Sequence, residues 1–436
     1  MKKLIMSALF LLPAIAVFAG SGHEVPALFG IRIEFIIFAL TLVGVALFHH
    51  YTMQVALGGL TVLLIAKFAF DPEFSLGGLM LGNEHHEGEW KTLLNLVGLL
   101  LGFGILARHF EDSGLPQILP NILPDDWKGG FVLLAIIMLI SSFLDNIAAA
   151  MIGGTVALVV FRGKVHIGYI AAIIAASNAG GAGSVLGDTT TTIMWIDGVN
   201  PFDVIHAYIA SVVAFLVFGF IASRQQQKFQ PITKDADPNA KIIPMRLVIV
   251  VLILAGAITT NYLMDFPAVG VWVAILIGAL LVPTPWHEIK DALPGTIFLT
   301  ALVTCASLIP VDELPAASWQ TALSLGFISS VFDNIPLTKL CLDQGGYDWG
   351  VLAYAVGFGG SMLWFGSSAG VAITSKFPEA RSVGAYLRHG WHVILGYLAG
   401  FMALIFIMGW HPHATHKKAV ETETHQTTTN NKTHGN

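Results

Sequence analysis

The sequence predicts an all-α polytopic membrane protein built from two inverted repeats, with about 10 spans and two re-entrant hairpins. The first observation is composition: 55% of the 436 residues are hydrophobic and only 11% are charged, whereas an ordinary soluble domain carries about 25% charged residues. The second is a series of long charge-free stretches, and the third is a motif that occurs once in each half. So few charges could not cover a soluble surface, which argues against a cytosolic enzyme and a nucleic-acid binder.

Both ends of the chain differ from the apolar middle. Lys2 and Lys3 precede a short apolar run that ends at Ala19. This order is typical of a signal peptide over residues 1–19, and an uncleaved first helix is the alternative. Residues 411–436 are polar and rich in His and Thr, so we expect a disordered tail, on the periplasmic side.

Charge-free stretches divide the chain between these ends into spans. A membrane-crossing helix needs about 20 apolar residues, so the stretch 35–66 must hold two. The polar linker 224–245 separates a first repeat, 26–223, from a second, 246–410. The other stretches long enough for single spans are 92–107, 165–187, 204–223, 247–264, 266–287, 292–311, 349–375 and 389–416.

Lysine and arginine predict the orientation, because cytoplasmic loops carry an excess of these residues. The linker 224–245 is basic, whereas loops 197–203 and 343–348 carry acids and no Lys or Arg. We therefore expect an inner-membrane protein with the linker in the cytoplasm and both acidic loops in the periplasm. The other basic residues on the cytoplasmic side are Arg108, Lys128, Arg162, Lys164, Lys290, Lys376, Arg381 and Arg388.

Two segments do not fit a single crossing. Residues 129–161 contain Asp145 between basic flanks, which favours a hairpin that enters from the cytoplasm. Residues 314–342 contain Asp333 and have no basic flank, which favours a hairpin that enters from outside. Non-helical backbone at the tips is tolerated only where it is buried in protein or lines a cavity.

A repeated motif relates the two halves. SSFLDNI at 141–147 matches SSVFDNI at 329–335, and a glycine-interrupted span follows each motif. Each half then holds three spans, a hairpin, a broken span and a last span, which is the plan of secondary transporters. The matching glycines are Gly180, Gly181 and Gly187 in the first half and Gly359, Gly360 and Gly366 in the second.

Three carboxylates, Asp145, Asp188 and Asp333, stand beside breaks in apolar spans. A carboxylate in the middle of the membrane costs about 2.5–3.5 kcal/mol, so we interpret them as functional; the alternative is that the Asp-Asn pairs only cap the hairpin helices. A hard cation such as sodium prefers oxygen ligands, and its candidate ligands are Asp145, Asp188 and Thr189. Further oxygen donors near the breaks are Asn146, Ser177, Asn178, Ser184 and Asn334.

Charge competition suggests how such a site could couple two ions. If two of these aspartates share a pocket, ionising both is unfavourable, and one would bind either a proton or a metal cation. Lys339 follows Asp333 in the second hairpin. It is either a counter-ion of that acid or a lysine whose ammonium reaches the outer surface.

Residues 180–198, GGAGSVLGDTTTTIMWIDG, resemble the signature of NhaD-type sodium/proton antiporters, as do 141–146, 332–338 and 357–373. The resemblance covers most of residues 90–410. It implies a homodimeric, elevator-like carrier in the lipid bilayer that exchanges sodium or lithium for protons, with no cofactor, no enzymatic activity and no nucleic-acid partner. The site residues it implies are Asp145, Asn146, Asp188, Thr189, Thr190, Asp333, Asn334 and Thr338, supported by Ser367 and Ser368.

Two departures from the family pattern leave an alternative substrate open. Ala148–Ala150 stand where these antiporters usually carry hydroxyls, and Lys339 stands where a small residue is usual. A citrate or dicarboxylate carrier of the same superfamily would use Lys339 and helix N-termini to hold an anion. The intramembrane acids and the threonine run favour a cation. An intramembrane protease is disfavoured because Val185 interrupts its Gly-x-Gly-Asp pattern.

Overall fold

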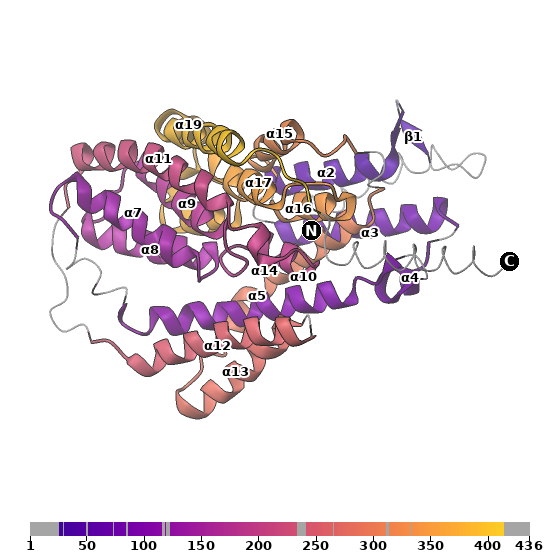
Figure 1. The fold of residues 1–436 in the computed structure, drawn as a ribbon, viewed down its shortest axis with the longest axis horizontal. Coiled ribbons are helices and arrows are strands. Elements are labelled where there is room, and N and C mark those ends of the chain that lie inside the picture. The colour runs from indigo at the N-terminus through magenta and orange to yellow at the C-terminus, as the bar shows by residue number, and fades with distance from the viewer. Residues whose placement is uncertain are drawn as a thin grey trace.

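The computed structural model describes residues 26–28, 30–48, 51–72, 74–83, 86–115, 118, 123–232, 241–264, 266–310, 314–332 and 334–413. Across these ranges the chain is almost entirely helical (Figure 1), and its β structure is two short hairpins, β1 (Ala27–Leu28) with β2 (Ile31–Arg32) and β3 (Gly82–Asn83) with β4 (His86–Glu87). The expected signal peptide, the tail from residue 414 onward and Asp333 lie outside the described residues.

The helices follow the same order in each half of the chain. In the first half they are α2 (Ile33–Leu47), α3 (Thr52–Phe70), α4 (Leu76–Leu81), α5 (Trp90–Glu111), α7 (Trp127–Ser141), α8 (Asn146–Val160), α9 (Ile167–Gly181), α10 (Thr189–Ile196), η1 (Pro201–Asp203) and α11 (Ala207–Phe229). In the second half they are α12 (Pro244–Met264), α13 (Pro267–Leu281), α14 (Glu288–Ser307), α15 (Trp319–Ser329), α16 (Asn334–Gln344), α17 (Trp349–Leu352), η3 (Ala353–Phe358), η4 (Gly360–Met362), α18 (Ser368–Lys376), η5 (Pro378–Arg381) and α19 (Val383–Met408).

The helices are long and apolar enough to cross a membrane. Among the described residues, 6 helical segments meet the length and composition for a span, namely α3, α5, η1 with α11, α12, α14 and α19, and shorter apolar helices accompany them. Outward faces carry large apolar side chains such as Leu280 and Phe406, which are 86% and 91% exposed. Such faces are stable against lipid rather than water. The prediction of a polytopic all-α membrane protein is therefore confirmed.

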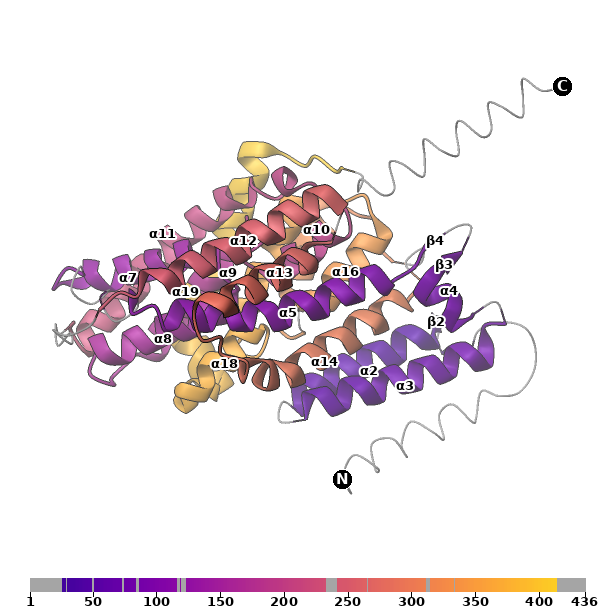
Figure 2. The ribbon, with the colours of Figure 1, turned by 90° about the horizontal axis from the view of Figure 1, so that it is seen from below.

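The helices pack as two sets. The three-span set is α2, α3 and α5 with α12, α13 and α14, in which α14 packs against α3 and α5, and α13 against α12. The hairpin set is α7 to α11 with α15 to α19, in which α11 packs against α19, and α9 against α7. Figures 1 and 2 show α5, α12 and α13 side by side, and in Figure 1 they lie below α7 and α8. The two sets meet where α16 contacts α14 and α10 contacts α5.

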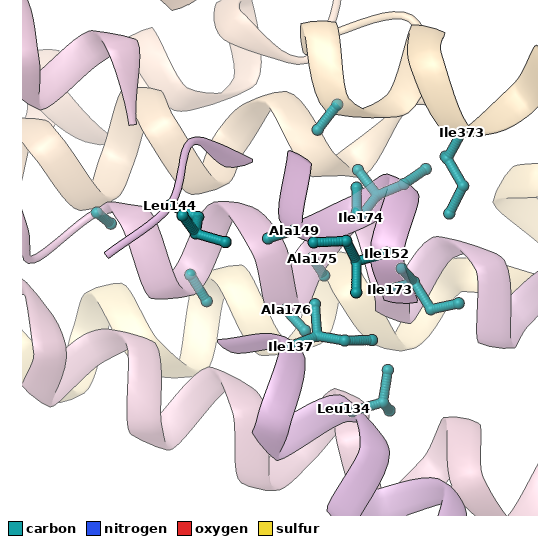
Figure 3. Close-up of a cluster of buried hydrophobic side chains, with 14 of the residues drawn as sticks. Leu134, Ile137, Leu144, Ala149, Ile152, Ile173, Ile174, Ala175, Ala176 and Ile373 are labelled. Carbon is teal, nitrogen blue, oxygen red and sulfur yellow. The ribbon is translucent and has the colours of Figure 1, made fainter. Parts of the chain in front are cut away.

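The first hairpin packs on the first broken span through a dense apolar cluster. Ile137 of α7 and Ile152 of α8 meet Ile173 and Ile174 of α9 in this cluster, together with Ile373 of α18 (Figure 3). Helix α9 is buried on all sides from Gly168 to its end, which explains why it is apolar around its whole circumference. The residues at its C-terminal end are therefore held rigidly.

Equivalent contacts position the break in each half. The hydroxyl of Ser141 donates to the carbonyl of Ser177 at 2.5 Å, and the hydroxyl of Ser329 donates to that of Val356 at 2.7 Å. A Cβ atom on Gly180 would overlap the carbonyl oxygen of Met138, and one on Gly359 would overlap that of Gly326. The two halves thus share contacts as well as a motif, and each hairpin lies close to the following break because glycine leaves room.

The loops gather at two ends of the molecule. At one end, Asp348 binds His206 at 2.7 Å and accepts a hydrogen bond from the backbone amide of His411 at 3.0 Å. At the other, Arg246 pairs with Asp112 at 3.2 Å. Which end faces the periplasm stays a prediction.

Candidate ion-binding site

Two carboxylates begin half-length helices in the middle of the hairpin set. Asp145 lies between α7 and α8 and accepts a hydrogen bond from the amide of Ile147 at 2.9 Å. Asp188 lies between α9 and α10 and accepts one from the amide of Thr190 at 3.3 Å. The N-terminus of a helix carries a partial positive charge, so each carboxylate is stabilised where the helix begins.

A buried polar network joins these elements. The side-chain amide of Asn146 donates to Oδ1 of Asn178 and to Oδ1 of Asp188, both at 3.0 Å. The amide of Asn178 donates in turn to the hydroxyl of Ser361 at 2.9 Å. None of these four side chains is more than 2% exposed. The network therefore connects the first hairpin, the first broken span and the second half of the chain.

Two buried amide oxygens have no hydrogen-bond partner among the residues that the structure describes. They are the Oδ1 atoms of Asn146 and Asn334, which are the first residues of α8 and α16. A buried oxygen left unsatisfied costs about 1–3 kcal/mol, so its presence requires an explanation. Carbonyl oxygens of this kind are ligands for a hard cation.

The four threonines after Asp188 form two pairs that donate hydrogen bonds to different kinds of acceptor. The hydroxyl of Thr189 donates to Asp145 at 3.3 Å, and that of Thr190 donates to Asp188 at 3.1 Å. Thr191 and Thr192 donate instead to the carbonyls of Ser184 and Val185, at 2.7 and 2.9 Å. The first two hydroxyls thus contact the carboxylates, and the other two hold the loop between α9 and α10.

The second broken span makes room for Asp188. A Cβ atom on Gly357 would lie 2.9 Å from Oδ2 of Asp188. Gly357 belongs to η3, a π-helical turn, and such turns often occur at functional sites. It stands two residues before Gly359, just as Asn178 stands two residues before Gly180. Gly357 and Ser361 were not among the predicted site residues, although their spacing to the glycine pair was a usable signal.

The other predicted hydroxyls bind backbone groups. Ser177 donates to the carbonyl of Ile174 and Thr338 to that of Asn334, each within its own helix. The hydroxyl of Ser184 accepts a hydrogen bond from the amide of Leu186 within the break, and that of Ser367 accepts one from the amide of Gly370. Ser368 is the first residue of α18. These side chains therefore shape the helix ends around the network.

Lys339 is buried and has three acidic partners. Its ammonium lies 2.6 Å from Asp343, 2.9 Å from Glu89 and 3.9 Å from Asp197. The side chain is only 2% exposed, so the interpretation of a lysine that reaches the outer surface is wrong. A buried ammonium is costly unless counter-charges surround it. Asp197 and Asp343 belong to the acidic loops 197–203 and 343–348, but nothing in the sequence connected these acids with Lys339.

The fold and the site define the class of protein: a polytopic membrane protein with two interrupted spans, two helical hairpins and a buried polar network where they meet. Its relatives are sodium/proton antiporters. The chain is 25% identical to sodium/proton antiporter 1 of Arabidopsis thaliana over 376 residues, which is 73% of this chain and 61% of the relative. It therefore spans less than two thirds of that relative's length.

Two bacterial proteins show a comparable similarity. The Na(+)/H(+) antiporter NhaD of Alkalimonas amylolytica is 23% identical over 339 residues, covering 64% of this chain and 69% of the relative. The NhaD protein of Vibrio parahaemolyticus is 23% identical over 329 residues, covering 62% and 78%. No protein-family model matches the chain. These relatives confirm the resemblance to NhaD-type antiporters that the motifs predicted.

Proposed function

We propose that this protein is a secondary active transporter that exchanges sodium or lithium for protons. One observation carries the proposal: the buried carboxylate of Asp188 is bound by the amide of Asn146, whose own carbonyl oxygen has no partner within the described part of the chain. A carboxylate and a neighbouring amide oxygen suit a small hard cation. The names of the relatives, sodium/proton antiporters, support sodium and protons as the exchanged ions.

The coupling follows from the charge of Asp188. When ionised, the carboxylate attracts a sodium ion, and the free oxygen of Asn146 completes part of its shell. When protonated, it loses that charge and binds sodium poorly. One buried site therefore holds a proton or a sodium ion but not both, and this competition couples their movements. Asp145 accepts a hydrogen bond from Thr189, the residue after Asp188. It is therefore a second acid close enough to the site to take part in the competition between sodium and protons.

Alternating access requires the site to face each side in turn. The network lies within the hairpin set. The three-span set contacts the hairpin set through α14 and α5. We propose an elevator-like movement of the hairpin set along the three-span set, in a homodimer of the inner membrane with the tail on the periplasmic side. The break residues that bind the ion travel with the hairpin set.

The anion-carrier alternative is weaker. It needs the ammonium of Lys339 as a ligand for a carboxylate substrate. Three carboxylates already surround that ammonium, the closest at 2.6 Å, and an anion would have to displace them against their repulsion.

Proteoliposomes with an imposed pH gradient test the proposal. We expect sodium and lithium, but not citrate, to dissipate the gradient through the wild-type protein. Asp188→Asn should abolish the response yet fold normally, because Asn is an equally good N-cap for α10. Asp203→Asn, in η1 outside the network, is the matched control and should keep full activity. A citrate response without a sodium response would overturn the proposal.

A further inference from the structure

The ion cluster around Lys339 connects the outer ends of three helices. Lys339 and Asp343 belong to α16, Asp197 follows the last residue of α10, and Glu89 precedes the first residue of α5. Helices α10 and α16 pack against each other. Asp188 caps the N-terminus of α10 and Asn334 is the first residue of α16, so the cluster lies towards the opposite, C-terminal ends of these two half-length helices.

Within the cluster, the pair between Lys339 and Glu89 differs from the other two. Asp343 and Asp197 belong to the hairpin set, as Lys339 does, whereas Glu89 belongs to the three-span set. The 2.9 Å contact between Lys339 and Glu89 therefore crosses from one set to the other. By contrast, Arg108 with Glu288 is an ion pair within the three-span set.

We propose that the Lys339–Glu89 ion pair is an outer latch that holds the hairpin set in one of its two access states, which makes Glu89 a gating residue of the exchange. The inference rests on the proposed function, since it requires two states. A displacement of one helical turn, about 5.4 Å, separates two groups that now lie 2.9 Å apart. The pair therefore exists in one state, and its energy favours that state.

The negative charge of Glu89 can be removed without leaving the ammonium of Lys339 unpaired. In Glu89→Gln, Lys339 keeps the carboxylates of Asp343 and Asp197 as counter-charges. The two half-length helices then stay joined to each other, and only their connection to α5 weakens. Glu89→Asp keeps the charge but is one methylene shorter, and provides a milder second variant.

Spin-label distance measurements on the full chain in lipid nanodiscs test the latch. Labels at positions 94 of α5 and 202 of η1, where Leu94 and Phe202 are 54% and 77% exposed, report on the two sets after Cys305 and Cys341 are replaced by alanine. Glu89→Gln should reduce the population at the wild-type distance at least threefold, and Glu89→Asp by less. Asp71→Asn is the control, because Asp71 pairs with Lys67 within the three-span set, and it should match the wild type.

An unchanged distance distribution in Glu89→Gln would show that no latch exists. Sodium/proton exchange by the same samples separates the two proposals. If the distribution shifts but the wild type shows no exchange, the latch stands and the proposed substrate fails. If the wild type exchanges sodium for protons but the distribution does not move, the antiport stands and the latch fails.

Discussion

Asn146 donates a hydrogen bond to Asp188 at 3.0 Å and thereby joins the tip of the first hairpin to the break in the following span. The same amide nitrogen also donates to Asn178. Because both acceptors face the nitrogen, the carbonyl oxygen of Asn146 points elsewhere and meets no partner in the described ranges. The arrangement leaves one oxygen beside an acid available to a cation.

Removing either unpartnered amide oxygen should weaken sodium binding. We expect Asn334→Ala to raise the half-saturating sodium concentration about tenfold, which corresponds to about 1.4 kcal/mol. Asn146→Ala should have a larger effect because it also removes the donor to Asp188. Thr338→Val is the control, since that hydroxyl binds its own helix backbone. Sodium titrations of exchange in proteoliposomes measure these values, and equal affinities in all variants would exclude the two oxygens as ligands.

Two glycine substitutions should separate binding from folding. In Gly357→Ala the new Cβ atom meets a side-chain carboxylate oxygen of Asp188 rather than backbone, so we expect lower sodium affinity with a nearly unchanged Tm. In Gly180→Ala it meets the rigid backbone carbonyl of Met138, so we expect poor folding and low yield. Size-exclusion profiles, thermal unfolding and sodium titrations distinguish the two results. A wild-type affinity in Gly357→Ala would mean that this glycine does not shape the site.

Acidification should weaken the contact between Asp348 and His206. Burial would raise the pKa of Asp348, but hydrogen bonds from His206 and from the amides of His411 and Val351 hold it below its ordinary value. The pKa is thus lower in the folded than in the unfolded state, where it is about 3.9. The stabilisation is therefore present above about pH 4 and is lost as the pH falls through the folded-state pKa.

Thermal unfolding in detergent from pH 7 to pH 3 measures this effect. Asp348→Asn should lower the free energy of unfolding by about 1–2 kcal/mol at pH 7, because a charged acceptor is replaced by a neutral one. The difference from the wild type should shrink towards pH 3. A difference that is constant across this range would contradict the assignment, and Asp203→Asn, in η1, is the control.

Thiol labelling tests which end of the molecule faces outward. In a chain without Cys305 and Cys341, cysteines at positions 200 and 345 should react with an impermeant reagent in intact cells, and one at position 235 should react only after lysis. The reason is the excess of Lys and Arg on the opposite side. The reverse labelling would overturn the predicted orientation, and labelling of positions 200 and 345 from opposite sides would overturn the inverted relation of the two repeats.

The sequence by itself determined the helical membrane class and the positions of the interrupted helices. In lipid, a long apolar stretch can satisfy its backbone hydrogen-bonding groups only as a helix. This requirement depends on the stretch itself and not on its contacts with other parts of the chain. The breaks between α7 and α8 and between α9 and α10 could be predicted from the sequence because Asp145 and Asp188 interrupt apolar runs. The repeated motif likewise appears without knowledge of any contact.

Only the tertiary structure decided which polar groups meet. Asn178 binds Ser361, 183 positions away, and Lys339 lies against Glu89 from the other helix set. The four threonines after Asp188 look alike in sequence, yet two contact carboxylates and two contact backbone. Composition and spacing describe neighbours along the chain, whereas a buried polar group takes its partner from whichever element packs against it, and burial makes that partner necessary.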